Sequence, residues 1–386
     1  MIKIKTKFFD FRLDYYCLFL LICAPFLLPE IVSKAVPMIN ILLTYLSIVC
    51  MFGLICLNIH LVRVKIIVLC NFYLFIIFLT TIFWNKSQVV AYFFQIWKVI
   101  LMCLIINIVL KSSKKFSISF LLAIRDFTIF FFIINIIYSV INHKILVREC
   151  LYGNVNATIK CIMPGIICSL ILDKKISKIS KITITYFSGF IFLFIYSYNM
   201  VTALVALLFI CAWITFQKVI KKKVKFYYFI SIVVILIIEN IIVISSNIQV
   251  LIKIAIFFGK SSDFSGRFFL WNNAIKNIKE SIVCGYGYIE ASVLKRIIGN
   301  PYGSHNYYLD VALNSGIVGV FFLLLLMIAP IYSIKKAELN SEIDDTQYIL
   351  LGAWITYLIM FLTEPWAGWE IMFIPVIVAF LILQNK

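Results

Sequence analysis

The sequence predicts an all-α protein: a polytopic transmembrane helical bundle of about 12 spans, with one long extracytoplasmic loop containing an amphipathic helix. Of the 386 residues, 63% are hydrophobic and the mean hydropathy is +1.06, far above the apolar share of soluble domains. Apolar runs of about twenty residues recur along the chain, which is the length that a helix needs to cross a bilayer. These runs lack the alternation of a membrane β-barrel, so that class is excluded.

The expected spans follow from the apolar runs in chain order, separated by short polar or basic breaks. They cover residues 15–29, 39–59, 66–84, 89–110, 127–141, 161–172, 182–198, 200–216, 226–244, 307–334, 348–362 and 371–383. The chain thereby divides into a first transmembrane part (1–244), an extracytoplasmic loop (245–306) and a second transmembrane part (307–386).

The net charge of +18 is explained by membrane topology and not by nucleic-acid binding. With the N-terminus in the cytoplasm, most lysines and arginines of the loops fall on the cytoplasmic side. Apart from the long loop, the opposite side holds only Lys34, Lys86, Lys144, Arg148 and Lys160. Positive loops are retained in the cytoplasm, so both termini are expected there. The first run is expected to be an uncleaved span, because no small-residue cleavage site follows it.

The segment 245–306 is the longest stretch between two spans, at roughly sixty residues, and loops of that length are usually functional or disordered. Apolar residues recur in it at helical spacing, which predicts an amphipathic helix on the membrane surface; they are Phe268, Trp271, Ile275, Ile278 and Ile282. Ser265 is the expected N-cap. The turn "CGYGY" that follows has two glycines, which let the backbone reverse or approach a neighbour closely.

Arg267 and His305 are the candidate catalytic residues of this loop. A cation in the first turn of a helix opposes the helix dipole, which indicates a bound anion nearby; an ordinary surface arginine is the alternative. His305 and Asn306 lie at the start of the next span, which Ser304 could cap. Imidazole suits proton transfer at neutral pH. A solvated histidine is the alternative, and His143 is the competing candidate.

Other chemistry-bearing groups are few. Lys98, Gln95 and Glu239 fall within expected spans, where polar residues are costly and often functional, although packing or snorkelling would also explain them. The outer loops contain no acidic cluster with metal-ligand spacing, and most cysteines lie inside apolar runs. We therefore expect neither a metal site nor a cofactor.

The order of "SGR" at 265–267, "GYG" at 285–287 and "HNYYLDVALNSGIVG" from His305 resembles the bacterial O-antigen polymerase and O-antigen ligase superfamily, including Wzy-type polymerases. The resemblance implies metal-independent, inverting glycosyl transfer from an undecaprenyl-pyrophosphate-linked glycan to a sugar hydroxyl at the outer face of the inner membrane. In this scheme Arg267 binds the pyrophosphate, His305 is the general base and Asn306 orients it.

Further site residues are expected from charge and from the family pattern. Lys276 and Arg296 would add positive field around the pyrophosphate. Asn156 matches an Asn-rich stretch of the family. The family's second arginine is missing, since the corresponding turn has Asn199, and Arg148 is the candidate replacement.

The resemblance implies a function: polymerisation of lipid-linked repeat units into capsular, O-antigen or exopolysaccharide chains. The implied partners are lipid-linked donor and acceptor glycans, the bilayer, a chain-length regulator and a flippase. An O-antigen ligase-type transferase and a lipid-linked oligosaccharide flippase or transporter are the alternatives.

Overall fold

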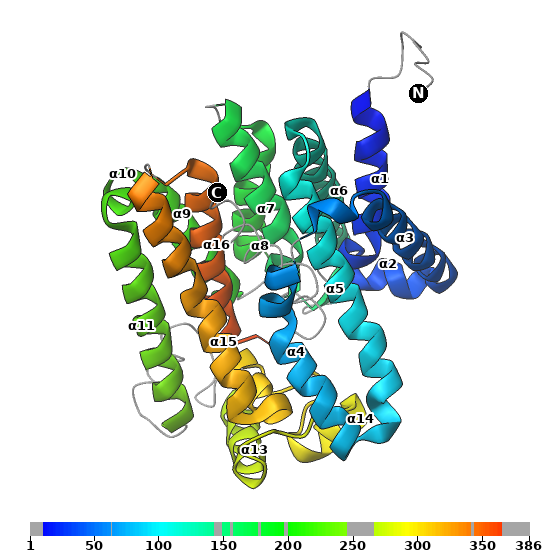
Figure 1. The fold of residues 1–386 in the computed structure, drawn as a ribbon, viewed down its shortest axis with the longest axis vertical. Helices are drawn as coiled ribbons and strands as arrows, with labels where there is room; N and C mark the ends of the chain where they lie inside the picture. The colour runs from blue at the N-terminus through cyan, green and yellow to red at the C-terminus, as the bar shows by residue number, and fades with distance from the viewer. Residues whose placement is uncertain are drawn as a thin grey trace. The chain divides into compact units, whose positions relative to one another are not determined.

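The computed structural model describes residues 11–62, 64–142, 149–154, 157–176, 179–196, 200–244, 266–340 and 343–364. Nearly all of this chain is helical (Figure 1), which confirms the predicted fold class. The one strand pairing in the described residues joins Glu149–Cys150 (β1) to Gly153–Asn154 (β2), antiparallel.

The helices occur in the following order, with three short 3₁₀ turns at Ile59–Leu61, Lys86–Gln88 and Lys221–Lys223. They are α1 (Phe11–Leu27), α2 (Glu30–Ala35), α3 (Pro37–Leu57), α4 (Val64–Trp84), α5 (Val89–Lys111), α6 (Lys114–Asn142), α7 (Ala157–Ile176), α8 (Lys181–Tyr196), α9 (Val201–Thr215), α10 (Gln217–Ile220), α11 (Val224–Ile244), α13 (Arg267–Glu280), α14 (Ala291–Ile297), α15 (Tyr307–Asn340) and α16 (Asp345–Phe361).

Each expected span up to residue 362 falls on one of these helices, whereas 371–383 lies outside the described residues. Among the described helices, five are long and apolar enough to cross a membrane: Pro37–Leu57, Lys86–Val109, Lys114–Asn142, Gln217–Ile241 and Tyr307–Ile331. Shorter apolar helices run over Tyr15–Leu27, Leu74–Trp84, Lys181–Tyr196 and Val201–Thr215. The chain is thus a multi-pass membrane protein, and the total of twelve spans stays a prediction.

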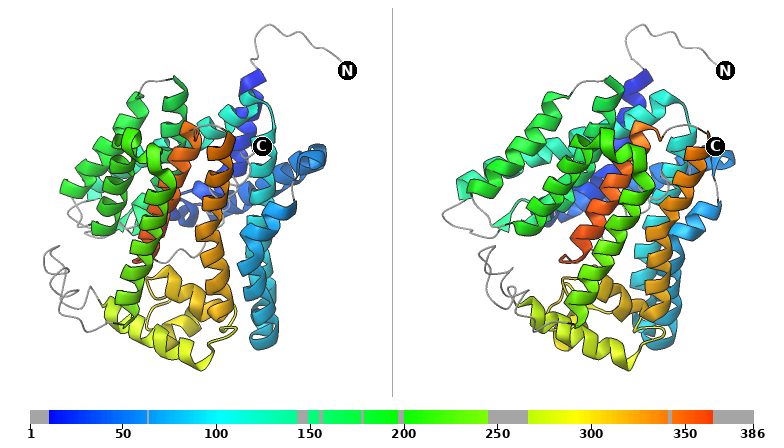
Figure 2. Two further views of the ribbon diagram at one scale, coloured as in Figure 1. Left: turned by 60° about the vertical axis from the view of Figure 1, so that its left-hand side comes forward. Right: turned by 90° about the vertical axis from the view of Figure 1, so that its left-hand side faces the viewer.

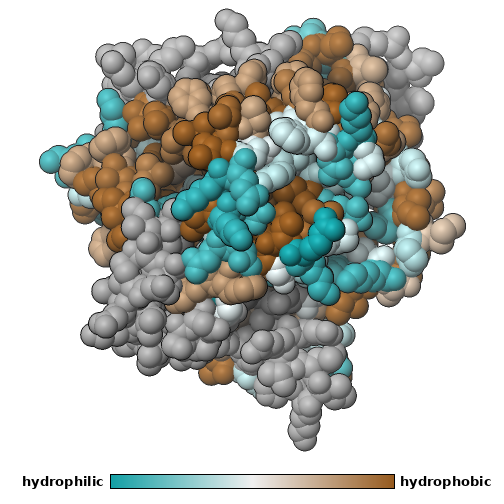
Figure 3. Space-filling model, turned by 90° about the horizontal axis from the view of Figure 1, so that it is seen from below, coloured by the Kyte–Doolittle hydropathy of each residue, from teal (hydrophilic) through white to brown (hydrophobic). Residues whose placement is uncertain are grey.

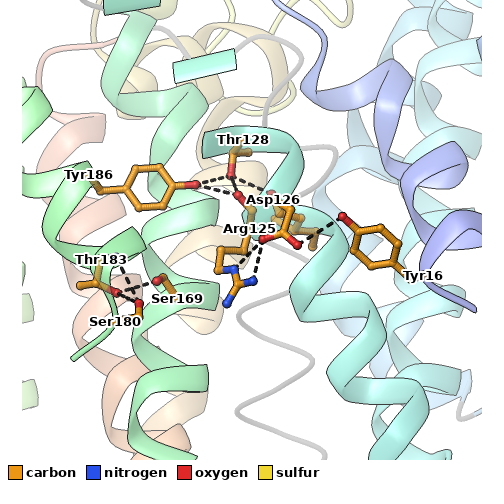
Figure 4. Close-up of polar contacts among 9 residues, drawn as sticks. Tyr16, Arg125, Asp126, Thr128, Ser169, Ser180, Thr183 and Tyr186 are labelled. Atoms are coloured by element: carbon orange, nitrogen blue, oxygen red, sulfur yellow. Dashed lines mark hydrogen bonds and ion pairs between the residues drawn. The ribbon is translucent and has the colours of Figure 1, made fainter. Parts of the chain in front are cut away.

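The chain forms two compact units, Met1–Val62 with Leu104–Met200 and Arg63–Cys103 with Val201–Lys386. In the first unit, α6 packs against α1, α7 and α8. The charged pair Arg125 and Asp126, joined at 2.7 Å, lies within α6 (Figure 4). Tyr16 donates to Asp126 Oδ2 at 3.2 Å, and Tyr186 donates to the carbonyl of Arg125 at 2.9 Å. Because Arg125 and Asp126 neutralise each other, α6 can include both, and it starts at Lys114, well before the span expected at 127–141.

In the second unit, α16 is buried on all sides from Tyr348 to Leu358, as expected for a helix that is apolar all around. It packs against α9, α11 and α15. The indole of Trp213 on α9 donates to the carbonyl of Tyr348 at 3.0 Å, and the two rings stack with centroids 5.2 Å apart. Helix α16 therefore forms the core of the unit, and its packing holds its C-terminal end in a defined position.

Helix α15 is broken at Gly316, whose φ of 61° and ψ of −160° are not helical. The break leaves the carbonyls of Leu313 and Asn314 without helical donors. Tyr286 N–H and Gly287 N–H donate to them, each at 2.9 Å. In return, the N–H groups of residues 317 and 318 donate to the carbonyls of residues 282 and 283, at 2.8 and 3.4 Å. The loop 281–288 thus replaces the hydrogen bonds that the helix loses.

The two predicted glycines of "CGYGY" allow this close approach. Gly285 and Gly287 have φ of 65° and 73°. A Cβ at Gly285 would lie 2.5 Å from the carbonyl carbon of Asn314, and one at Gly287 would lie 2.7 Å from Cα of Thr81. Helix α4 holds the same loop, because Tyr288 N–H donates to Thr81 Oγ1 at 2.8 Å. The loop is therefore clamped between α4 and α15.

Gly316→Ala tests this clamp. A Cβ at this position would lie 2.2 Å from the carbonyl oxygen of Val283, on a backbone that L-residues avoid. We expect a loss of about 1–3 kcal/mol of stability, seen as a lower melting temperature of the detergent-purified protein. Gly53→Ala in α3 is the matched control, since nothing lies within 4 Å of its Cβ. Equal melting temperatures for the two variants would contradict the clamp.

Candidate functional site

Helix α13 starts one residue later than expected, with Gly266 as its N-cap in the left-handed conformation (φ 82°). Ser265 lies outside the described residues. Arg267 is the first helical residue and thus lies in the first turn, as predicted, and α13 packs against α15. The buried face consists of Phe268, Trp271 and Ala274. Ile282 was wrongly included in this face, because the helix ends at Glu280 and Ile282 is 53% exposed.

Arg267 makes an ion pair with Glu364. The Nη2 of the guanidinium lies 3.2 Å from Oε1 of the carboxylate, and the two side chains are 14% and 4% exposed. The sequence predicts an anion beside this cation, since a positive charge at a helix N-terminus is unfavourable. The structure supplies that anion from the chain itself. An arginine paired this way is not an ordinary surface arginine.

His305 and Asn306 form the entry into α15. Among the described residues other than glycine, His305 alone has a positive φ, at 58°. Asn306 is fully buried and caps the helix, because its Oδ1 accepts the N–H of Leu309 at 3.1 Å. The predicted cap, Ser304, instead donates its hydroxyl to the carbonyl of Asn306 at 2.8 Å. The cap is therefore Asn306, since only its side chain reaches the third N–H of the helix.

Glu239 of α11 completes this entry. Its Oε2 accepts the Nδ2–H of Asn306 at 2.9 Å, and the residue is 9% exposed. Because both ends of the Asn306 amide are used, its orientation is fixed. This contact gives the intramembrane carboxylate of the sequence a specific partner: it anchors α11 to the start of α15, directly beside His305.

The starts of α13 and α15 both reach the C-terminal end of α16. Tyr307 and Tyr308 place their rings on Phe361, with centroids 4.5 and 6.1 Å apart. Tyr308 also donates to the carbonyl of Leu358 at 2.9 Å. Glu364, which holds Arg267, follows Phe361 by one turn. Figures 1 and 2 show these helix ends together at the lower part of the unit. The segments carrying His305 and Arg267 thus share one support.

This arrangement favours the binding of an anion. Two helix N-termini carry positive partial charge near the C-terminal end of α16, and Arg267, whose charge Glu364 balances, keeps further N–H donors for an anion. Glu364 was missed by sequence reasoning because no motif marks it. The one available signal was a single carboxylate following the apolar run of α16 in "FLTEPW".

Lys276 and Arg296 are exposed, on α13 and α14 respectively, and so are Lys279 and Lys295. Helix α13 holds α14, since Asn273 Nδ2 donates to the carbonyl of Ile298 at 3.0 Å. Figure 3 shows hydrophilic side chains gathered on the lower end of the molecule, where these two helices lie in Figure 1. The four cations form a solvated basic surface, at which salt screens their field.

Several predicted residues have no described position. Asn156, Arg148, His143 and Asn199 lie outside the described residues, so their roles stay predictions. Among the described residues, no three histidine, cysteine, aspartate or glutamate side chains come together as a possible metal site. The expected independence of metal stays a prediction as well.

Comparison with known proteins adds independent findings. Residues 184–324 match the family model described as O-antigen ligase, a range that includes both Arg267 and His305. A stretch of 107 residues is 28% identical to the exopolysaccharide production protein ExoQ of Rhizobium meliloti (strain 1021), covering 25% of each chain. This chain therefore spans a quarter of the length of that relative. No solved structure is significantly similar. The two matches confirm the resemblance to the O-antigen ligase and polymerase superfamily that the motifs indicated.

Proposed function

We propose that the protein polymerises undecaprenyl-pyrophosphate-linked repeat units into capsular, O-antigen or exopolysaccharide chains at the outer face of the bacterial inner membrane. One observation carries the proposal: the helix starts that bear Arg267 and His305 both contact the buried C-terminal end of α16, and both residues lie within the range that matches the family model. An arginine and a histidine at one site suit the transfer of a sugar away from an anionic leaving group.

Arg267 stabilises the leaving group in this mechanism. When the bond between the anomeric carbon and the pyrophosphate oxygen breaks, negative charge accumulates on that oxygen. A preorganised cation lowers the energy of this state. A guanidinium has five N–H donors, and the contact with Glu364 runs through Nη2. The remaining donors are suited to phosphate oxygens, and the dipoles of α13 and α15 add to the attraction.

His305 acts as the general base. Neutral imidazole takes the proton of the acceptor hydroxyl while the acceptor oxygen bonds to the anomeric carbon and the pyrophosphate leaves on the opposite side. No metal is needed, since the protein supplies both the cation and the base. The unusual backbone of His305 is held by its buried neighbour Asn306, which Glu239 and Leu309 fix in place. Strained positions of this kind occur mainly at functional sites.

The exposed cations Lys276 and Arg296 attract the charged donor along the basic surface of α13 and α14. The roles of Arg148 and Asn156 in donor binding stay predictions from the sequence. A chain-length regulator and a flippase act with the protein, and both termini lie in the cytoplasm.

A ligase-type transferase is the second candidate, because the matching family model is described as O-antigen ligase. The name of the bacterial relative, an exopolysaccharide production protein, favours polymer formation. The two activities share the donor chemistry and differ in the acceptor. A polymerase accepts another repeat unit, and a ligase accepts a different lipid or protein. Supplying purified repeat units alone separates them, since only a polymerase would lengthen them.

The proposed outer-face chemistry requires α13 and α14 to be extracytoplasmic. A cysteine at exposed Ser292 of α14, in a Cys284→Ser background, should react with a membrane-impermeant maleimide on intact cells. A cysteine at exposed Lys222, on the side expected to be cytoplasmic, should react only after lysis. Labelling is read by gel shift of the purified protein. The reverse pattern would overturn both the topology and the outer-face reaction.

Arg267→Ala should reduce polymer formation by about 100- to 1000-fold, the usual cost of losing a group that stabilises a developing anion. Arg267→Lys should also be severely impaired, because lysine keeps the charge but loses the planar fork. The readout is polymer length and amount on gels at matched protein level. Lys34→Ala, at an exposed lysine paired with Glu30, is the control and should behave as wild type. Normal polymer in Arg267→Ala would end the leaving-group role.

Loss of the base should abolish long product and cause single lipid-linked repeat units to accumulate. We expect a rate reduction of about 100- to 10,000-fold for His305→Ala. His305→Asn is the better variant, because asparagine tolerates the left-handed backbone but cannot act as this base. The readout is high-molecular-weight product and lipid-linked intermediates.

His60→Ala, at an exposed histidine, is the control and should leave the product unchanged. Persistence of long polymer in His305→Asn but its loss in His143→Ala would move the base to the earlier loop. Disappearance of repeat units from the outer leaflet would indicate a flippase.

A further inference from the structure

We infer that Glu364 is a positioning residue for Arg267: it holds the guanidinium by one edge and presents the other edge to the pyrophosphate of the donor. The inference rests on the proposed role of Arg267 as the ligand of the leaving group. It adds to the site a carboxylate that neither the motif order nor the expected charge pattern predicted.

The burial of the pair makes Glu364 the anion that compensates Arg267. Glu364 is 4% exposed and Arg267 is 14% exposed. A cation at the first position of a helix opposes the helix dipole. Within the described part of the chain, the ion pair with Glu364 is the polar contact recorded for Arg267. The carboxylate therefore determines where this guanidinium points.

The geometry of the contact leaves N–H donors of the guanidinium for a second anion. The bond runs from Nη2 to Oε1 at 3.2 Å and is not a bidentate pair of parallel bonds. A planar guanidinium held at one terminal nitrogen keeps its Nε and Nη1 donors for another ligand. A bidentate pair would have used two N–H donors on one edge of the guanidinium for the contact with Glu364. The observed contact orients the arginine without saturating it.

Glu364 itself stands on a rigid support. Its N–H donates to the carbonyl of Met360 at 3.1 Å, which closes the last turn of α16. Thr363 beside it bonds through its hydroxyl to Thr202 of α9 at 2.9 Å. Helix α16 is the most buried helix of its unit. A group fixed in this way locates a partner well, because its own position has little freedom.

Glu364 could instead block Arg267, and removing its charge would then have the opposite effect on donor use. If Glu364 blocked the arginine until the donor displaced it, removing its charge would free the site and lower the donor KM. If Glu364 positions the arginine, removing its charge lowers the turnover of the donor. The blocking role and the positioning role are therefore distinguished by the kinetic constants for the donor, measured at equal protein level.

The test uses the full-length protein in nanodiscs with purified lipid-linked repeat units as donor and acceptor, and measures the initial rate against donor concentration. Glu364→Gln keeps the shape of the side chain and removes its charge. We expect kcat/KM for the donor to fall about 10- to 100-fold, the usual cost of misplacing a reacting group. Glu364→Asp should recover part of the activity. A donor KM below that of wild type would overturn the inference.

Asp345→Asn provides the matched control. Asp345 lies at the other end of the same helix and pairs with Lys221 at 2.5 Å. The variant reports any general effect of weakening α16, and it should leave the rate unchanged. An equal loss of activity in Asp345→Asn and Glu364→Gln would show a merely structural role and overturn the positioning role.

A double variant separates this inference from the proposed function. If Glu364 acts through Arg267, then adding Glu364→Gln to Arg267→Ala should cause no further loss of rate, since the group that it positions is already gone. If the loss of rate in the double variant equals the product of the losses in the two single variants, the inference is overturned. Full activity in Arg267→Ala would overturn the proposed function as well. Loss of activity in Arg267→Ala together with a fully active Glu364→Gln would refute the positioning role alone.

Discussion

The satisfaction of backbone hydrogen bonds is the constraint on which the second unit depends. In lipid, an unpaired N–H or C=O costs several kcal/mol, so irregular backbone survives only where protein supplies partners. The break in α15 at Gly316 meets this condition, because residues 282, 283, 286 and 287 exchange four hydrogen bonds with residues 313, 314, 317 and 318. The same exchange fixes the loop between α13 and α14. The loop at 281–288 is thereby packed against α4 and α15.

Buried charged groups are likewise compensated by partners that the protein itself supplies. Asp126 neutralises Arg125 inside α6, and Glu364 neutralises Arg267 at the start of α13. Glu239 has a neutral partner, the amide of Asn306. Buried ion pairs contribute little net stability relative to apolar side chains of the same size. The presence of the Arg267–Glu364 pair at the candidate site is better explained by the orientation that it imposes.

The candidate site is built from helix ends on one buried helix. Arg267 starts α13, His305 precedes α15, and both segments contact the C-terminal end of α16. Helix ends leave unpaired N–H groups and partial positive charge, which a leaving pyrophosphate would exploit. Because α16 is buried on all sides, small displacements of this support are resisted by close packing. Such a support suits a reaction that depends on the alignment of a base, an acceptor and a leaving group.

The sequence by itself determined the helical membrane class, the place of each described span, the helix that begins at Arg267 and the two glycines that let the loop approach α15. These features follow from composition and from local periodicity, which act within a few residues. Only the tertiary structure decided that Asn306 and not Ser304 caps α15, that Glu239 is the partner of Asn306, and that Glu364 holds Arg267. The last two contacts join residues 67 and 97 positions apart. No local pattern encodes them, because each partner is chosen by how the helices pack.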